Sequence, residues 1–164
     1  MGYTHYFKIK KSKILGKTRQ YESAYQKAIR DCQTIVRQYN KDLKATDPKH
    51  PDRLQGYSAH TEVGEYGGVN FNGVGKLAHE TFTLREHLGQ NNDFNFCKTA
   101  GKPYDIVVVA CLVVLADSLG DAIEVTSDGT SGDWLAGLNL ARHILKDNNL
   151  GIPDQIMIDS LEVV

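Results

Sequence analysis

Seven small and polar residues, Ser127 to Asp133, form a segment with the composition of an anion-binding loop. They lie between a predicted strand and a predicted helix, where free backbone N–H groups attract phosphate or carboxylate. The glycine and hydroxyl positions let a ligand approach closely. A simpler interpretation is a turn in which Ser131 or Asp133 caps the helix. The spacing matches neither a Walker motif nor a dinucleotide fingerprint, and the aspartates fit no EF-hand.

Histidines are the second set of candidates: His5, His60, His79 and His87. None stands at a metal-binding spacing such as His-Glu-x-x-His, and no cysteine pair supports a zinc site, so we predict no metal site. A histidine within a strand, such as His5, is more often a hydrogen-bonded core residue than a catalyst. His79 and Glu80 are neighbours on a predicted strand, so they point to opposite faces and cannot form one acid–base pair without a bulge.

Cys97 lies near Lys98 and Lys102, and a helix predicted to begin at Pro103 adds the positive end of its dipole. Both influences lower the pKa of a thiol. A nucleophilic cysteine also needs a base within reach, which a histidine could supply. Most cysteines of this kind are instead small buried hydrophobic residues. The two lysines then serve as anion contacts or surface charges.

Aromatic side chains complete a pattern that suits a nucleotide, because bases stack on flat rings while phosphates bind N–H groups and cations. Most aromatic residues simply fill a core, so the pattern does not define a site by itself. The rings expected near an open sheet face or its loops are Tyr3, Tyr6, Tyr57, Tyr66, Phe71, Tyr104 and Trp134.

Periodicity in the sequence predicts an α+β fold with one mainly antiparallel sheet and about three helices packed on one of its faces. Polar strand residues such as His79 would then look out from the open face. Strands are predicted where apolar and polar residues alternate, and helices where apolar residues recur every three or four positions. The expected strands are 3–9, 69–75, 78–86 and 122–126, and the expected helices are 21–43, 103–119 and 134–146.

Residues 103–119 could equally form a buried strand, because many of their side chains are β-branched. Pro103 suits the first helical position, Asp105 suits the first turn and Gly120 suits the end, so we predict a helix. A helix that is apolar on nearly every side must be central and buried. We expect Asp105 to cap this helix or to pair with Lys102.

The 164 residues are expected to form a single domain, with a core of residues 1–147 and a carboxyl-terminal extension of residues 148–164. The extension is expected to form an edge strand or a contact between subunits in a homo-oligomer. Residues 44–68 are expected to form a long loop. Because 19 basic residues are balanced by 20 acidic ones, generic nucleic-acid binding is disfavoured. Basic residues gather between 8 and 19, as a solvated loop or an anion-attracting rim.

Three cysteines without close pairs argue against a disulfide framework, and no secretion signal opens the chain. The longest apolar run, residues 106–116, is too short to span a bilayer. We therefore expect a cytoplasmic protein that does not enter a membrane, and we expect no cofactor.

Four segments carry a family resemblance: MGYTHY at 1–6, HETF at 79–82, FCKTAGKPYD at 96–105 and SDG at 127–129. They resemble a family of small proteins found in bacteriophage genomes and in some bacteria, which often begin with MGYTHY and carry a KTARKPYD-like segment. The resemblance extends over residues 1–147. Gly101 stands where arginine is expected in many relatives, so a positive contact is lost there. The resemblance implies a phage-type accessory protein that acts against a host system in the host cytoplasm, and it implies no catalytic residue.

We therefore expect a binding protein rather than an enzyme. The expected ligand is small and anionic, a nucleotide being the favoured class, and the expected role is counter-defence by sequestering a host nucleotide immune signal. One alternative is a small nucleotide hydrolase or transferase that uses His5 or His79 as acid–base, assisted by Asp128. Another is a protein–protein inhibitor of a host factor that uses the apolar tail. The expected ligand contacts are His5, His79, Lys98, Lys102, Ser127 and Asp128.

Overall fold

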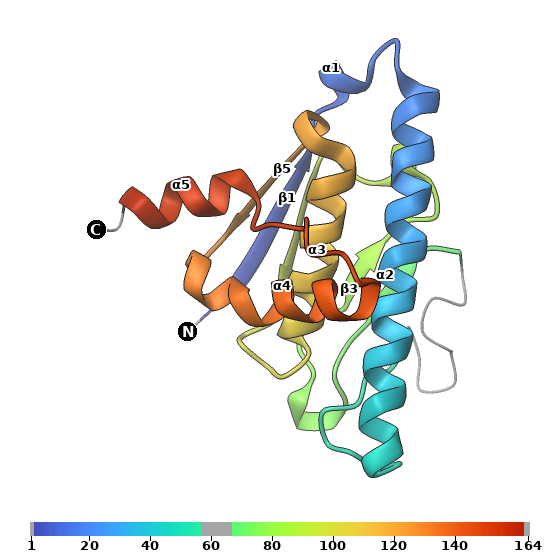
Figure 1. Ribbon diagram of the computed structural model, residues 1–164, viewed down its shortest axis with the longest axis vertical. Coiled ribbons are helices and arrows are strands. Elements are labelled where there is room, and N and C mark those ends of the chain that lie inside the picture. Colours follow the sequence, from blue (N-terminus) through green and yellow to red (C-terminus); the bar gives the residue numbers. More distant parts are fainter. Residues whose placement is uncertain (1, 57–66, 163–164) are drawn as a thin grey trace.

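The computed structural model describes residues 2–56 and 67–162, which form an α+β fold, as predicted (Figure 1). Three of its helices are long, and two of its strands have only three residues each. Short 3-10 turns occupy Gly75–Leu77, Leu88–Gln90 and Gly120–Ala122. The remaining elements are β1 (Thr4–Ile9), α1 (Lys11–Ile14), α2 (Thr18–Thr46), β2 (Val69–Phe71), β3 (Phe82–Leu84), β4 (Phe94–Lys98), α3 (Asp105–Leu119), β5 (Ile123–Ser127), α4 (Ser131–Leu145) and α5 (Asp154–Glu162).

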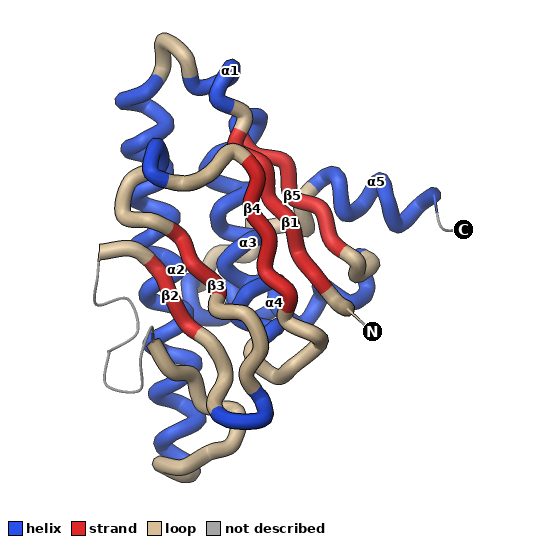
Figure 2. Tube along the Cα trace, turned by 180° about the vertical axis from the view of Figure 1, so that it is seen from behind, coloured by secondary structure: helices blue, strands red, loops and turns tan. Residues whose placement is uncertain are grey.

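The strands form two antiparallel sheets rather than the single sheet predicted. A three-stranded sheet has the order β4-β1-β5, and β2 pairs with β3 in a separate hairpin. Figure 2 shows the two sheets side by side, with the helices behind them. Glu80, just before β3, explains why the sheets do not merge along β4. Its N–H donates to the Lys98 carbonyl (3.2 Å) and its carboxylate accepts from the Lys98 N–H (2.7 Å), so a side chain replaces the next rung of the ladder.

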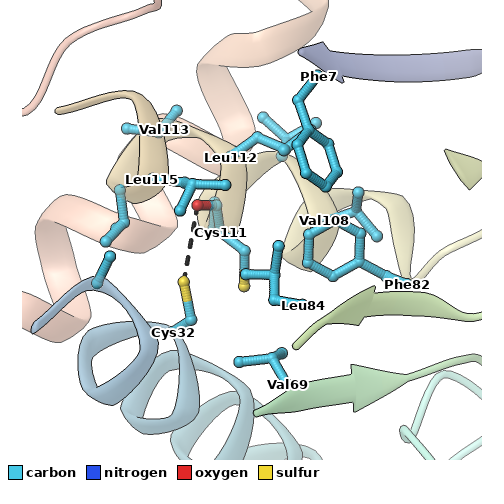
Figure 3. Packing of buried hydrophobic residues seen from close by; sticks show 14 of the residues in the cluster. Phe7, Cys32, Val69, Phe82, Leu84, Val108, Cys111, Leu112, Val113 and Leu115 are labelled. Atoms are coloured by element: carbon cyan, nitrogen blue, oxygen red, sulfur yellow. Dashed lines mark hydrogen bonds between the residues drawn. The ribbon is translucent and has the colours of Figure 1, made fainter. Parts of the chain in front are cut away.

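Helix α3 is the centre of the core, as its apolar composition predicts. It packs against both α2 and α4, and every side chain from Val107 to Leu115 is buried. Figure 3 shows its contact with α2, where the Cys32 thiol donates to the Cys111 carbonyl (3.7 Å). Leu119 is followed by Gly120 with φ 50°, a left-handed conformation that favours glycine and ends the helix.

The carboxyl-terminal extension forms helix α5, so the predicted edge strand is wrong. Pro153 precedes the helix and Asp154 occupies its first turn, both of which favour helix initiation. Ile156 is buried, whereas Met157, Ile158 and Leu161 are exposed. Figure 1 shows α5 projecting from the side of the molecule beside β5.

Part of the predicted 44–68 loop belongs to α2, which runs to Thr46, and Gln55 forms an isolated bridge with Asn72. His60, Tyr57 and Tyr66 lie outside the described residues. Within the described ranges, no helix combines the length and the apolar character needed to cross a membrane.

Candidate functional site

Four segments that are distant in sequence meet at one end of the three-stranded sheet. These are the start of β1, the end of β4, the end of β5 and the start of α3. Backbone bonds hold them together: the Thr4 N–H donates to the Asp128 carboxylate (3.0 Å), the Asp128 N–H donates to the Thr4 carbonyl (3.0 Å), and the Thr99 N–H donates to the Tyr3 carbonyl (3.0 Å). The sequence candidates His5, Ser127, Asp128 and Lys98 therefore lie at the same end of the sheet.

His5 joins β5 to α3 through a buried hydrogen-bond network. Its Nδ1 lies 2.7 Å from the Ser127 Oγ, and its Nε2 lies 2.7 Å from the Asp105 Oδ1. The Thr99 hydroxyl donates to the same carboxylate oxygen (2.5 Å), and the Gly129 N–H donates to the Ser127 Oγ (2.9 Å). Asp105 thus binds His5 and Thr99, two partners that differ from those predicted for it.

The His5 ring is enclosed as well as hydrogen-bonded. The rings of Tyr3 and Trp134 meet it edge-on, with centroids 5.1 and 5.3 Å away, and only 1% of the residue is exposed. Both ring nitrogens are occupied by protein partners. His5 therefore orients the surrounding segments and has no free atom to offer a ligand in this arrangement.

N–H groups of the Ser127–Asp133 loop are already hydrogen-bonded to other groups of the protein. The Thr130 N–H donates to the Asp133 carboxylate (2.8 Å) in a capping box, and the Ser131 N–H donates to the Ser160 hydroxyl of α5 (2.8 Å). Burial, followed by the negative charges of nearby aspartates, raises the pKa of the Tyr3 phenol to about 12. Internal bonding and acidic surroundings both make this loop a poor anion site.

The remaining cationic candidates lie beside the end of β4. His79 is exposed, and its Nδ1–H donates to the Lys98 carbonyl (2.8 Å). The Lys98 side chain is half-buried and packs over Gly2, where an added Cβ would lie 3.0 Å from the Lys98 Cε. Lys102 is also half-buried, and its N–H donates to the Thr99 carbonyl (3.0 Å). Lys98 and His79 are therefore direct neighbours.

Cys97 is a small buried residue, as the favoured interpretation of the sequence predicts, and not the activated thiol of the alternative. Cys97 points into the core, and its Sγ donates to the Glu80 carbonyl (3.5 Å). Burial, reinforced by the negative charge of Glu80, raises the pKa of the thiol to about 12. These two influences outweigh the lysines and the helix dipole, which are the basis of the activated-thiol alternative.

Alkylation of the native protein by iodoacetamide at pH 8 is therefore expected to be at least about a hundredfold slower than in denaturant. Cys97 has little thiolate at that pH, and the other two cysteines, Cys32 and Cys111, are also buried. Timed mass spectrometry measures the rate. A Leu15→Cys variant, at a position 83% exposed, provides a thiol that must react quickly in the native state. Rapid labelling of Cys97 in the native protein would contradict the conclusion that this thiol is buried and not activated.

Two phenylalanines on the outer face of the sheet, Phe94 and Phe96, are the candidates that the sequence analysis missed, whereas Tyr6 lies at the open face as expected. Phe94 and Phe96 of β4 are 56% and 59% exposed. Tyr6 of β1 pairs with Phe96 in the register and lies on the same face, with its ring centroid 6.0 Å from that of Phe94. Three rings predicted at an open face, those of Phe71, Tyr104 and Trp134, are instead buried in the core.

The signal for Phe94 and Phe96 was present in the sequence Phe-Asn-Phe-Cys-Lys, which has the period of a strand. Its large apolar side chains alternate with Asn95 and Cys97. Because Cys97 faces the helices, the two phenylalanines must face away from them. We name Tyr6, Phe94 and Phe96 the aromatic face.

A hollow of about 260 Å³ adjoins the aromatic face, between β4 and the segment that includes β3. Phe94 and Phe96 form one wall, and Thr81, Thr83 and Arg85 contribute to the other. The backbone of Arg85 is fixed, since its carbonyl accepts from the Tyr25 hydroxyl (2.5 Å) and its N–H donates to the Asn91 side chain (3.1 Å). The residues that line the hollow thus include two phenylalanines, two threonines and an arginine.

Among residues 2–56 and 67–162, no group of three or more His, Cys, Asp or Glu side chains is arranged to hold a metal ion. Comparison of the chain with models of protein families, with curated proteins and with solved structures gave no match.

Proposed function

We propose that this protein binds a nucleotide on the outer face of its three-stranded sheet. The observation that carries the proposal is the aromatic face, which presents two largely exposed phenylalanines on one strand. An aromatic ring can stack on any of the bases, and each such contact contributes about 1–3 kcal/mol to binding. Phe7 and Phe82, by contrast, lie on other strands and are buried in the core.

Cations at both ends of the aromatic face support an anionic ligand. Lys8 lies opposite Phe94, and Lys98 follows Phe96 by two positions on the same face. Lys10 and Lys11, which follow Lys8 in the sequence, form ion pairs with Glu124 and Asp93. Lys8 and Lys98 form no ion pair with any described residue. A phosphate bound beside either lysine would gain a charge-assisted hydrogen bond.

The sequence candidates divide into two groups in this proposal. Lys98 contacts the ligand directly, and His79 and Lys102, which lie near the same end of β4 as Lys98, provide further anion contacts. His5, Ser127 and Asp128 hold the strands that carry the aromatic face. The biological role proposed is sequestration of a host nucleotide signal by a phage-type counter-defence protein, which rests on the resemblance of the four sequence segments.

Hydrolysis is a second candidate function, and the Ser127–His5–Asp105 arrangement favours it. A hydroxyl, an imidazole and a carboxylate joined in series are the components of acyl- and group-transfer sites. In this protein Nδ1 of the ring faces the serine, the ring is enclosed, and the nearby N–H groups of Gly129 and Thr130 already have protein partners. Binding is therefore the better supported of the two.

Isothermal calorimetry with a panel of adenine, guanine, cytosine and uracil nucleotides, linear and cyclic, tests the proposal. Phe96→Ala is expected to weaken binding by at least about fivefold, since one stacking contact is lost. Leu15→Ala removes another exposed apolar side chain, one that does not belong to the aromatic face, and is expected to change nothing. Absence of heat with every nucleotide, or unchanged affinity in Phe96→Ala, would contradict the proposal. Chromatography of the ligand released by denaturation separates the two candidates: a binder returns it intact, and a hydrolase returns product.

A further inference from the structure

We infer that the ligand carries two bases, so that its chemical class is a dinucleotide. This inference rests on the proposed function and specifies its ligand. Phe94 and Phe96 are two residues apart on one strand face, and their ring centroids are 6.3 Å apart with a 39° angle between the ring planes. Each ring is more than half exposed, so each offers a separate stacking surface.

The spacing of the two rings selects unstacked bases. Successive bases in a duplex strand lie about 3.4 Å apart, roughly half the distance between the phenylalanine rings. Two neighbouring bases can each contact one ring only if they are splayed apart, which is how proteins bind single-stranded segments. A mononucleotide fills one of the two positions and leaves the other ring exposed to water.

The hollow beside the rings offers groups for the linking phosphate and for the base edges. Arg85 lines it, forms no ion pair with any described residue, and has the planar donor fork that suits phosphate. Thr81 and Thr83 are exposed on the same side and add hydroxyl groups. A phosphate between two splayed bases would therefore have a cation within the hollow.

The edge of β4 also offers backbone groups to the hollow. The bonds from the Ile9 N–H to the Asp93 carbonyl (2.7 Å) and from the Thr99 N–H to the Tyr3 carbonyl (3.0 Å) direct the odd-numbered residues toward β1. By the alternation of an antiparallel ladder, the backbone groups of Phe94 and Phe96 point the other way. Glu80 occupies those of Lys98, whereas those of Phe94 and Phe96 bond no backbone group of residues 2–56 or 67–162 and can bond base edges.

The charge distribution limits the length of the ligand. The chain has a formal net charge of −1, and the carboxylates of Glu80, Asp93 and Glu124 lie around the aromatic face. A long polyanion gains affinity by neutralising many phosphates, which this surface cannot do. Two rings and one guanidinium match two bases and the phosphate between them.

Fluorescence anisotropy competition with three probes tests the inference: adenosine monophosphate, linear diadenylate and a ten-residue oligoadenylate. Diadenylate is expected to bind at least about tenfold more tightly than the monophosphate, equivalent to one added stacking contact. Phe94→Ala and Arg85→Gln are expected to weaken diadenylate binding more than monophosphate binding, so that the ratio of the two affinities falls toward one, and Leu15→Ala is expected to retain the tenfold ratio.

Equal affinity for the monophosphate and diadenylate would overturn the two-base inference and leave nucleotide binding intact. An oligoadenylate that binds more than about tenfold more tightly than diadenylate would also overturn it, in favour of a single-strand surface. If no probe binds, both the inference and the proposed function fail. Circular dichroism of each variant confirms folding, which substitution at the exposed Phe94 should not affect.

Discussion

Gly137→Ala is expected to lower the free energy of unfolding by about 2 kcal/mol, although alanine is the better helix former by about 1 kcal/mol. Gly137 lies where α4 crosses α3, as Figure 1 shows for the two helices. A Cβ at this position would lie 2.4 Å from a methyl group of Val109 and 3.0 Å from the Ile106 carbonyl. Val109 is buried and short, so it cannot move aside, and the two helices must separate. Urea denaturation followed by circular dichroism measures the loss.

Two variants separate this packing effect from helix propensity. Gly132→Ala lies in the same helix, but the nearest atom to its added Cβ is 3.6 Å away, so it is expected to be neutral or stabilising. Val109→Ala combined with Gly137→Ala removes the obstructing methyl groups and is expected to recover part of the lost stability. A Gly137→Ala variant as stable as the unmodified protein would show that the helices tolerate a wider separation.

His5→Ala is expected to cost about 3 kcal/mol in the free energy of unfolding, because it creates a cavity and removes two buried hydrogen bonds. The Asp105 carboxylate and the Ser127 hydroxyl each lose a partner at 2.7 Å, and the edge contacts with Tyr3 and Trp134 disappear. Chemical denaturation at fixed pH measures the change, and nucleotide affinity of the folded fraction is expected to stay within about twofold of the unmodified protein.

His79→Ala is the matched control, because this histidine is exposed and bonds a single backbone carbonyl. Its free energy of unfolding is expected to remain within about 0.5 kcal/mol of the unmodified value. The opposite pattern, in which His5→Ala keeps its stability and loses affinity, would assign His5 to ligand contact.

The long helices of the fold were predictable from the sequence. The end signals of α3, namely Pro103, Asp105 and Gly120, outweighed its β-branched composition, and the structure confirms the helix at Asp105–Leu119. The strand at residues 4–9 and the β2–β3 hairpin also follow from local alternation. Local patterns of this kind act over a few residues, which is the range that sequence periodicity reports.

Strand β4 and helix α5 were missed for a shared reason. Both present apolar side chains to the outside, Phe94 and Phe96 in β4 and Ile158 and Leu161 in α5. Pattern analysis assumes that apolar side chains point inward, so it misreads elements whose exposed face is apolar. Such elements are also the ones most suited to contact a ligand or partner.

The candidate site depended on pairing that no local pattern encodes. His5 meets Ser127 because β1 and β5 pair in that register, across 122 positions of sequence, and it meets Asp105 across 100 positions. The expectation that His5 and Ser127 contact the same ligand came from residue types alone. The enclosure of His5 by Tyr3 and Trp134 depends on tertiary packing and could not be predicted in the same way.

The central position of β1 has a consequence for folding during synthesis. Its two partners, β4 and β5, begin at Phe94 and Ile123, so β1 leaves the ribosome long before either can pair with it. Until then, Phe7 and Ile9 have no sheet to complete, and contacts of such high sequence separation form slowly. A nascent chain stalled before β5 is therefore expected to aggregate, because β1 would still have an unpaired edge.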